Sequence, residues 1–251
     1  MVDTITLSLP ALDVLGEHLR LDVRRYPFEI PAIADTPAER GDVVRRVWSE
    51  LETAGLAVDG RPEPEVADAL YLISSSECSI AAAGLLDVRN GQRMAARAVA
   101  TGEVGVAGVI TGRGLQLDFM APETLPEVCA RLLPPAPPGS GRETGVPLRL
   151  LRDSEHRSAG GVASAGAESP SDVEEITRLH KYRLGHFVVA GTGEDGSRFR
   201  MPTLTWFDTD RGRYTMCYGR SEEGETLFCA PADQQGIAAR LGEQLRSVRE
   251  G

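Results

Sequence analysis

The glycine-rich segment GTGEDG at residues 191–196 has the spacing G-x-G-x-x-G and follows a run with strand character. Such a loop binds a dinucleotide when a helix follows it, because the helix N-terminus then meets the pyrophosphate. Here the next residues, RFRMPTLTW at 198–206, are typical of a strand. Glu194 and Asp195 would also place negative charge where phosphate should lie. The pattern favours a hairpin turn over a cofactor site.

Histidines and a possible catalytic triplet are scattered along the chain. His180 and His186 flank KYRLG, whereas His18 is isolated. A zinc site needs three or four ligands at recognisable spacing, and these positions do not offer it. The triplet at 154–156, Ser-Glu-His, lies in a Pro- and Gly-rich segment where nothing holds a nucleophile and a base in register. We therefore expect no metal, no cofactor and no enzymatic activity.

The cysteines, Cys78, Cys129, Cys217 and Cys229, are far apart and form no C-x-x-C pair. Cys129 and Cys229 each lie near an Ala-Pro helix start, and a helix N-terminus can lower the pKa of a thiol. Cys129 falls within an apolar stripe, however, which favours core packing. Cys217 and Cys229 could face each other across a hairpin, but a reducing compartment disfavours a disulfide.

Composition narrows the possible partners of this 251-residue chain. The net charge of −10 and the pI near 5 argue against binding nucleic acid, because an acidic surface repels phosphate backbones. We find no apolar run of the ~18–20 residues that a membrane helix needs, and the first residues lack the pattern of a signal peptide. We therefore expect a cytoplasmic protein without membrane insertion. Lys181 is the only lysine among 27 basic residues, which indicates GC-rich coding and an actinobacterial source.

Two segments of the chain resemble each other. FMAPETLPEVCARL at 119–132 and FCAPADQQGIAARL at 228–241 share six of fourteen positions without a gap. Each follows several runs with the period of two that is typical of antiparallel strands, and each continues as an amphipathic helix. The repeat predicts an α+β fold of two quasi-symmetric halves, each an antiparallel β-meander with flanking helices. A meander alone leaves a sheet edge uncovered, so two halves can pair and enclose a cleft.

The predicted organisation is an N-terminal half at 1–133, a low-complexity linker at 134–172 and a C-terminal half at 173–251. The linker is rich in Pro, Gly, Ser and Ala and is expected to be mobile over much of its length. The two halves are expected to form one pseudo-two-fold domain.

Two places could bind a partner. Arg89, Asn90, Gly91, Gln92 and Arg93 form the tip of the first hairpin, where Asn-Gly predicts a type I′ turn. Plain turn chemistry also explains these residues. Trp206 and Phe207 end a strand, so one ring is expected in the core and the other toward solvent or a partner.

The chain resembles the EspG family, the cytosolic chaperones of type VII (ESX) secretion. The likeness rests on the N-terminal strand and Leu-rich helix, SELETAGLAVDGRPEPEVADAL, YRLGHFVVAGTGEDGSRFRMPTLTWFDTDRGRYTM and LFCAPADQQGIAARLGEQL. The resemblance implies a central antiparallel sheet between the two halves. It also implies binding to the apolar tip of a helical PE–PPE heterodimer, through the loop that corresponds here to Arg89–Gln92 with neighbouring Arg93, together with the sheet and the C-terminal helices.

Two alternatives stay open. One is a small-molecule-binding α+β domain or enzyme that uses the glycine turn at 191–196 and the cleft between the halves. The other is a scaffold that forms a homodimer through exposed sheet edges.

Overall fold

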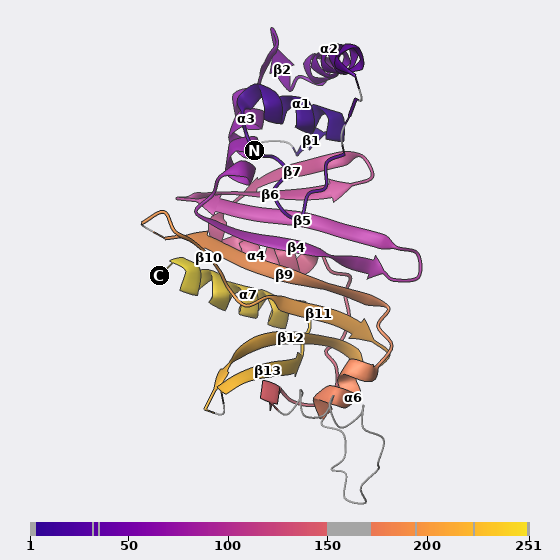
Figure 1. Ribbon diagram of the computed structural model, residues 1–251, viewed down its shortest axis with the longest axis vertical. Coiled ribbons are helices and arrows are strands. Elements are labelled where there is room, and N and C mark those ends of the chain that lie inside the picture. The colour runs from indigo at the N-terminus through magenta and orange to yellow at the C-terminus, as the bar shows by residue number, and fades with distance from the viewer. Residues whose placement is uncertain are drawn as a thin grey trace, which may run out of the picture.

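The structure is a computed structural model that describes residues 4–31, 33–34, 36–149, 172–193, 195–222 and 224–249 (Figure 1). These residues form a large antiparallel sheet with helices packed on it, which confirms the predicted α+β class. The sheet has 11 strands in the order β1-β7-β6-β5-β4-β9-β11-β12-β13-β8, and β10 pairs with β9 beside this path. Among the helices in this part of the chain, none is long and apolar enough to span a bilayer.

The strands of this sheet are β1 (Ile5–Leu7), β4 (Cys78–Asp87), β5 (Gln92–Thr101), β6 (Val104–Thr111), β7 (Gly114–Met120), β8 (Thr144–Pro147), β9 (Arg183–Thr192), β10 (Arg198–Arg200), β11 (Leu204–Thr209), β12 (Gly212–Ser221) and β13 (Gly224–Pro231). A separate small hairpin consists of β2 (Ala57–Val58) and β3 (Arg61–Pro62). The helices are α1 (Leu9–Leu19), α2 (Pro37–Thr53), α3 (Pro64–Ser74), the 3₁₀ turn η1 (Pro122–Thr124), α4 (Leu125–Arg131), α6 (Asp172–Arg178) and α7 (Gln234–Arg249).

The centre of the sheet is the antiparallel pairing of β4 with β9, which runs from Cys78↔Gly191 to Leu85↔Leu184. The meander β4–β7 continues on one side of this pairing, and β9, β11, β12 and β13 continue on the other. A duplicated meander predicts this strand order. Whether the two halves superimpose about a two-fold axis stays a prediction.

One face of the sheet packs against α4 and α7, which also contact each other. Helix α4 lies within the first of the two similar segments and α7 begins within the second, so the repeat places its two helices side by side. Their apolar stripe, which includes Leu125, Cys129, Ile237 and Leu241, packs on alternate residues of the central strands such as Ile80, Ala82, Phe187 and Val189. Pro122 begins η1 as expected, whereas Pro231 is the last residue of β13 and α7 begins later, at Gln234.

The opposite face is covered only toward its ends. Helices α1 and α3 pack on the N-terminal strands through Leu12, Leu15, Leu70 and Ile73. At the other end of the molecule α6 packs on β8 (Figure 1). Ser8 caps α1 by accepting a hydrogen bond from the Ala11 amide at 3.2 Å, which satisfies one of the free donors at the helix start.

Residues 134–149 differ from the predicted linker. The backbone of Arg213 donates to Pro137 O at 2.9 Å and accepts from Gly139 N at 2.8 Å, and β8 pairs with β13. At Gly139 a Cβ atom would lie 2.1 Å from the Tyr214 ring, so the close approach requires glycine. This stretch is part of the sheet edge. The remainder of the predicted mobile linker, at 150–171, lies outside the described residues.

The first hairpin forms, but the predicted type I′ turn is wrong. That turn needs positive φ at both central residues, and here Gly91 has φ +65° whereas Asn90 does not have positive φ. Four residues, 88–91, connect β4 to β5. The Asp87 carboxylate accepts hydrogen bonds from the Asn90 amide at 2.9 Å and from its Nδ2 at 2.7 Å, which favours the longer loop.

A buried ion pair fixes the C-terminal strands. Arg213 donates to both carboxylate oxygens of Asp208, from Nε at 2.6 Å and from Nη2 at 2.9 Å, and both side chains are 0% exposed. Arg183 lies 3.3 Å from the same carboxylate. Arg213 Nη2 also donates to Pro134 O at 2.8 Å, so the pair links β11 and β12 to the start of the 134–149 segment.

We predict that Asp208→Asn lowers the free energy of unfolding by about 3–5 kcal/mol, because it leaves the guanidinium of Arg213 buried without its counter-charge. Urea unfolding followed by circular dichroism measures the change. The matched control is Glu175→Gln, which removes the exposed ion pair of Glu175 with Arg211 and should cost less than about 1 kcal/mol. Equal losses in the two variants would contradict the prediction.

Candidate partner-binding surface

In the described structure the sheet face opposite α4 and α7 is open at the hairpin end of β4 and β9, whereas Ser79, Ala81 and Val188 farther along these strands are buried. Since Ile80, Ala82, Phe187 and Val189 point toward these two helices, the intervening residues of β4 and β9 point the other way. Their side chains are half-buried or exposed near the β4–β5 hairpin. We call this surface the open strip and define it by six residues, Ala83, Leu85, Arg93, Ala95, Leu184 and His186.

The strip consists of two rows of side chains that run across the strands. One row is Arg93, Leu85 and Leu184, which are neighbours in the registers of β5, β4 and β9. The next row is Ala95, Ala83 and His186. The alanine side chains in the second row are small. Side chains of a bound partner could therefore approach the backbone of the sheet there.

Tyr26, from the loop between α1 and α2, lies over the strip. Its ring stacks on His186 with centroids 6.0 Å apart and an interplanar angle of 12°, and its hydroxyl hydrogen bonds to His186 Nε2 at 2.5 Å. Burial lowers the pKa of His186 and raises the pKa of Tyr26, so both rings stay uncharged at neutral pH. The pair therefore adds uncharged ring surface to the strip.

Apolar side chains gather where the strip meets the hairpin. Leu184 is 37% exposed, Tyr182 40% and Val88 36%. The Val88 amide donates to Tyr182 O at 2.9 Å, which joins the hairpin tip to the start of β9. Apolar side chains that lie together on a surface, with charged residues beside them, are typical of protein-binding sites.

The structure brings the predicted hairpin residues together at one end of the strip. Arg89, Asn90, Gly91, Gln92 and Arg93 are all exposed. Arg93 forms an ion pair with Glu29 at 3.2 Å, with both side chains largely in solvent.

The prediction that either Trp206 or Phe207 faces solvent or a partner is wrong. Trp206 is 0% exposed and Phe207 2% exposed, because β11 is covered on both faces. The Trp206 ring lies in the α4–α7 core, and Phe207 stacks on Tyr214 with centroids 5.9 Å apart. Arg213 lies over the Trp206 ring at 5.4 Å, which further encloses it. Trp206 therefore presents no surface to a partner in this structure.

Sequence reasoning missed Tyr26, Leu184 and His186 as surface residues. The alternation of β9 carried a signal for Leu184 and His186, since both lie on the same face of a strand. That face could be recognised as open only once the pairing with β4 was known. Tyr26 lies in an irregular loop, where no sequence pattern predicts that its ring stacks on His186.

The GTGEDG segment is the predicted hairpin turn. It connects β9 to β10, which pair antiparallel from Thr192↔Arg198 to Ala190↔Arg200, and no helix follows. Gly196 has φ +79°, and the Asp195 carboxylate accepts the Ser197 amide at 2.8 Å. Glu194 and the triplet at 154–156 lie outside the described residues. Within the described part of the chain, no group of three or more His, Cys, Asp or Glu residues could hold a metal ion.

All four cysteines are free thiols, and three of them are buried. Burial raises the pKa of Cys129 to about 12 and that of Cys229 to about 11. Cys129 belongs to the apolar core, as its place in the stripe predicted. Since a thiolate is the reactive form, neither group is suited to act as a nucleophile near neutral pH.

The sheet with helices on both faces defines an α+β protein. The apolar and half-buried residues of the open strip form a surface that is suited to protein binding. A model of the EspG family matches residues 8–243, and the chain belongs to this family. The fold is similar to that in a solved structure of the Mycobacterium tuberculosis type VII secretion system chaperone EspG5 in complex with the PE25–PPE41 dimer. The TM-score is 0.69 at 15% sequence identity, over 99% of this chain and 96% of that chain. No curated protein matches the sequence.

We predict that Cys129 and Cys229 resist thiol reagents in the folded protein at pH 8. The raised pKa values mean that both groups are protonated there, and the packing denies access. Labelling with 5,5′-dithiobis(2-nitrobenzoate), followed by mass spectrometry, should modify half-buried Cys217 first and the others only after unfolding in urea. Cys217→Ser should remove the early reaction. Rapid labelling of Cys129 in the native state would contradict the assignment.

Proposed function

We propose that this chain is a cytoplasmic chaperone of a type VII (ESX) secretion system. It binds the apolar tip of a helical PE–PPE-like partner, keeps that partner soluble and directs it to export. The observation that carries the proposal is membership of the EspG family over residues 8–243. The complex of EspG5 with PE25–PPE41, a chaperone of similar fold, supports the choice of partner.

The open strip supports the proposal by its chemistry. A helical tip with an exposed apolar face tends to aggregate, and an apolar surface on a chaperone covers that face. Leu184 on β9, together with Tyr182 and Val88 just beyond the ends of the paired strands, offers such a surface. Burial of apolar area contributes about 25 cal/mol per Å², and a specific contact needs about 1,000 Å² in total. The neighbouring hairpin and the Tyr26–His186 pair extend the strip toward that size.

The hairpin tip contributes the polar part of the proposed contact. Arg89 and Arg93 place positive charge beside the apolar residues. The end of a helical hairpin presents free carbonyl groups with partial negative charge. Arginine side chains can donate to these carbonyls, so the tip is suited to orient the partner while the strip holds its apolar side chains.

The proposed complex contains one copy of the chaperone. The outermost strands of the described sheet, β1 and β8, have three and four residues. Short edge strands offer few free backbone groups for pairing with a second copy. The homodimer that the sequence left open is tested by light scattering of the purified chain.

Leu184→Arg should weaken binding of the PE–PPE-like pair by at least about tenfold, because the partner would have to bury an unpaired charge. Co-expression with a PE–PPE-like pair, followed by size-exclusion chromatography and calorimetry, measures complex formation and affinity. Val58→Arg is the matched control, because Val58 is also exposed but lies in the separate small hairpin. Absence of a complex with the unaltered chain would overturn the proposal.

Arg89→Glu combined with Arg93→Glu should also weaken the complex, by about tenfold, because the reversed charge opposes the helix carbonyls of the partner. The loss should become smaller as salt is raised, since both residues are exposed. Arg61→Glu with Arg113→Glu changes the charge equally at exposed sites away from the hairpin tip. Unchanged affinity in the hairpin variant would show that the hairpin tip is not part of the binding surface. The proposed role of the open strip would not be affected by that result.

A further inference from the structure

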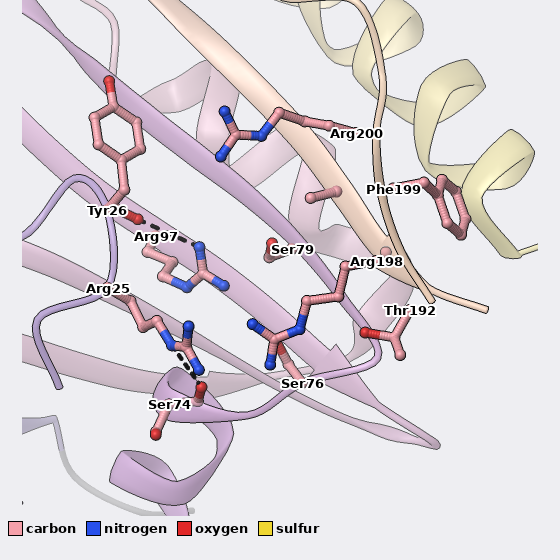
Figure 2. A pocket seen from close by; sticks show the side chains of 12 residues that line it. Arg25, Tyr26, Ser74, Ser76, Ser79, Arg97, Thr192, Arg198, Phe199 and Arg200 are labelled. Carbon is pink, nitrogen blue, oxygen red and sulfur yellow. Dashed lines mark hydrogen bonds between the residues drawn. The ribbon is translucent and has the colours of Figure 1, made fainter. Parts of the chain in front are cut away.

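A cavity of about 270 Å³ lies at the other end of the same sheet face (Figure 2). It is bounded by the starts of β4 and β10, the end of β9, a residue of β5 and the loop before α2. In Figure 1 the β9–β10 hairpin ends on the side of the molecule opposite the β4–β5 tip. From the pair Leu85↔Leu184 to the pair Cys78↔Gly191 the strands extend about 23 Å, at ~3.3 Å per residue.

Positive charge dominates this cavity. Its lining includes Arg25, Arg97, Arg198 and Arg200, and no aspartate or glutamate is among the described residues that line it. Figure 2 shows the guanidinium groups of Arg25, Arg97 and Arg198 around the same space, with Arg200 beside them. The other polar residues of the lining are Ser74, Ser76, Ser79 and Thr192.

The arginines are only partly satisfied by the protein. Arg25 donates from Nε to Ser74 O at 2.9 Å and lies 3.4 Å from Asp22. Arg97 donates from Nη1 to Tyr26 O at 3.3 Å, but its buried Nε has no hydrogen-bond partner. Within the described residues no hydrogen bond or ion pair engages the side chains of Arg198 and Arg200. Several donors therefore remain available to a ligand.

The arrangement is electrostatically unfavourable when the cavity is empty. Burial, followed by the charges of Arg25, Arg198 and Arg200, lowers the pKa of Arg97 to about 10. The guanidinium of Arg97 stays charged at neutral pH. It is therefore held among like charges, and burial and repulsion both disfavour its charged form. An anion in the cavity would reverse that effect by satisfying the free donors and screening the repulsion.

We propose that this cavity binds the phosphate group of a small molecule. Arginine forks and hydroxyl groups are the donors that phosphate oxygens prefer, and a doubly charged group matches several guanidinium groups better than a carboxylate does. The cavity is slightly smaller than the ~300–1,000 Å³ typical of drug-sized ligands, which favours a compact phosphate compound. A nucleic-acid strand is disfavoured by the net charge of −10. The site is separate from the hairpin tip, so it does not depend on the proposed chaperone function.

Isothermal titration calorimetry of the full chain with inorganic phosphate and with pyrophosphate tests the proposal, at ionic strength held constant with sodium chloride. Saturable binding is expected for at least one of the two probes, together with a dose-dependent rise in melting temperature. Sodium acetate and sodium chloride at the same ionic strength should give neither. Equal effects of acetate or chloride, or no binding of either phosphate probe, would overturn the assignment.

Arg198→Gln combined with Arg200→Gln should weaken phosphate binding by at least about tenfold, because two charged donors are lost. Both side chains belong to exposed residues without protein partners in the described structure, so folding should be unaffected. The melting temperature without phosphate should be equal to or higher than that of the unaltered chain, since repulsion is reduced. Arg113→Gln with Arg220→Gln is the control of equal charge change outside the cavity. Unchanged phosphate affinity in the Arg198/Arg200 variant, or an equal loss in the control, would contradict the proposal.

Discussion

The antiparallel ladder between β4 and β9 is the interaction on which the rest of the structure depends. It converts two meanders, each with an open edge, into one sheet, and its register decides which side chains face which layer. A shift of one residue on either strand would turn that strand's core side chains, Ile80 and Ala82 or Phe187 and Val189, away from α4 and α7. Burial of these residues therefore fixes both the core and the identity of the surface on the opposite face.

The open strip exists because helices cover the two sheet faces unequally. Helices α4 and α7 lie together across the central strands on one face. On the other face α1 and α3 pack over the N-terminal strands and α6 over the C-terminal end, so in the described structure the hairpin end of β4 and β9 is left to solvent and to Tyr26. The surface proposed for the partner therefore lies on the central strand pair of the sheet, where β4 is hydrogen-bonded to neighbours on both sides. A surface that is already ordered before binding loses less conformational entropy when the complex forms.

Local sequence patterns predicted the structural elements that depend mainly on residues close together in the chain. The period of two at residues 78–101 and the glycine turn after β9 gave the hairpins, and the similar segments gave α4 and α7. Strand β8 was missed because TGVP lies in a Pro- and Gly-rich segment and pairs with a strand formed much later in the chain. The burial of both Trp206 and Phe207 depends on two layers that close over β11, which strand alternation alone cannot reveal. The open strip and the arginine cavity likewise join segments that are distant in sequence.

Two arginines in the interior of the sheet show how differently a buried cation can be treated. Arg213 is fully enclosed, with its charge balanced by Asp208 through two hydrogen bonds. Arg97 is held among three other arginines, and none of the described residues that line its cavity is a carboxylate. The requirements of folding explain the first arrangement, because a buried charge is stable when it is paired. They do not explain the second, since an uncharged side chain at residue 97 would avoid the repulsion. The phosphate group proposed for this cavity would supply counter-charge that the described protein provides only in part, through Asp22 beside Arg25.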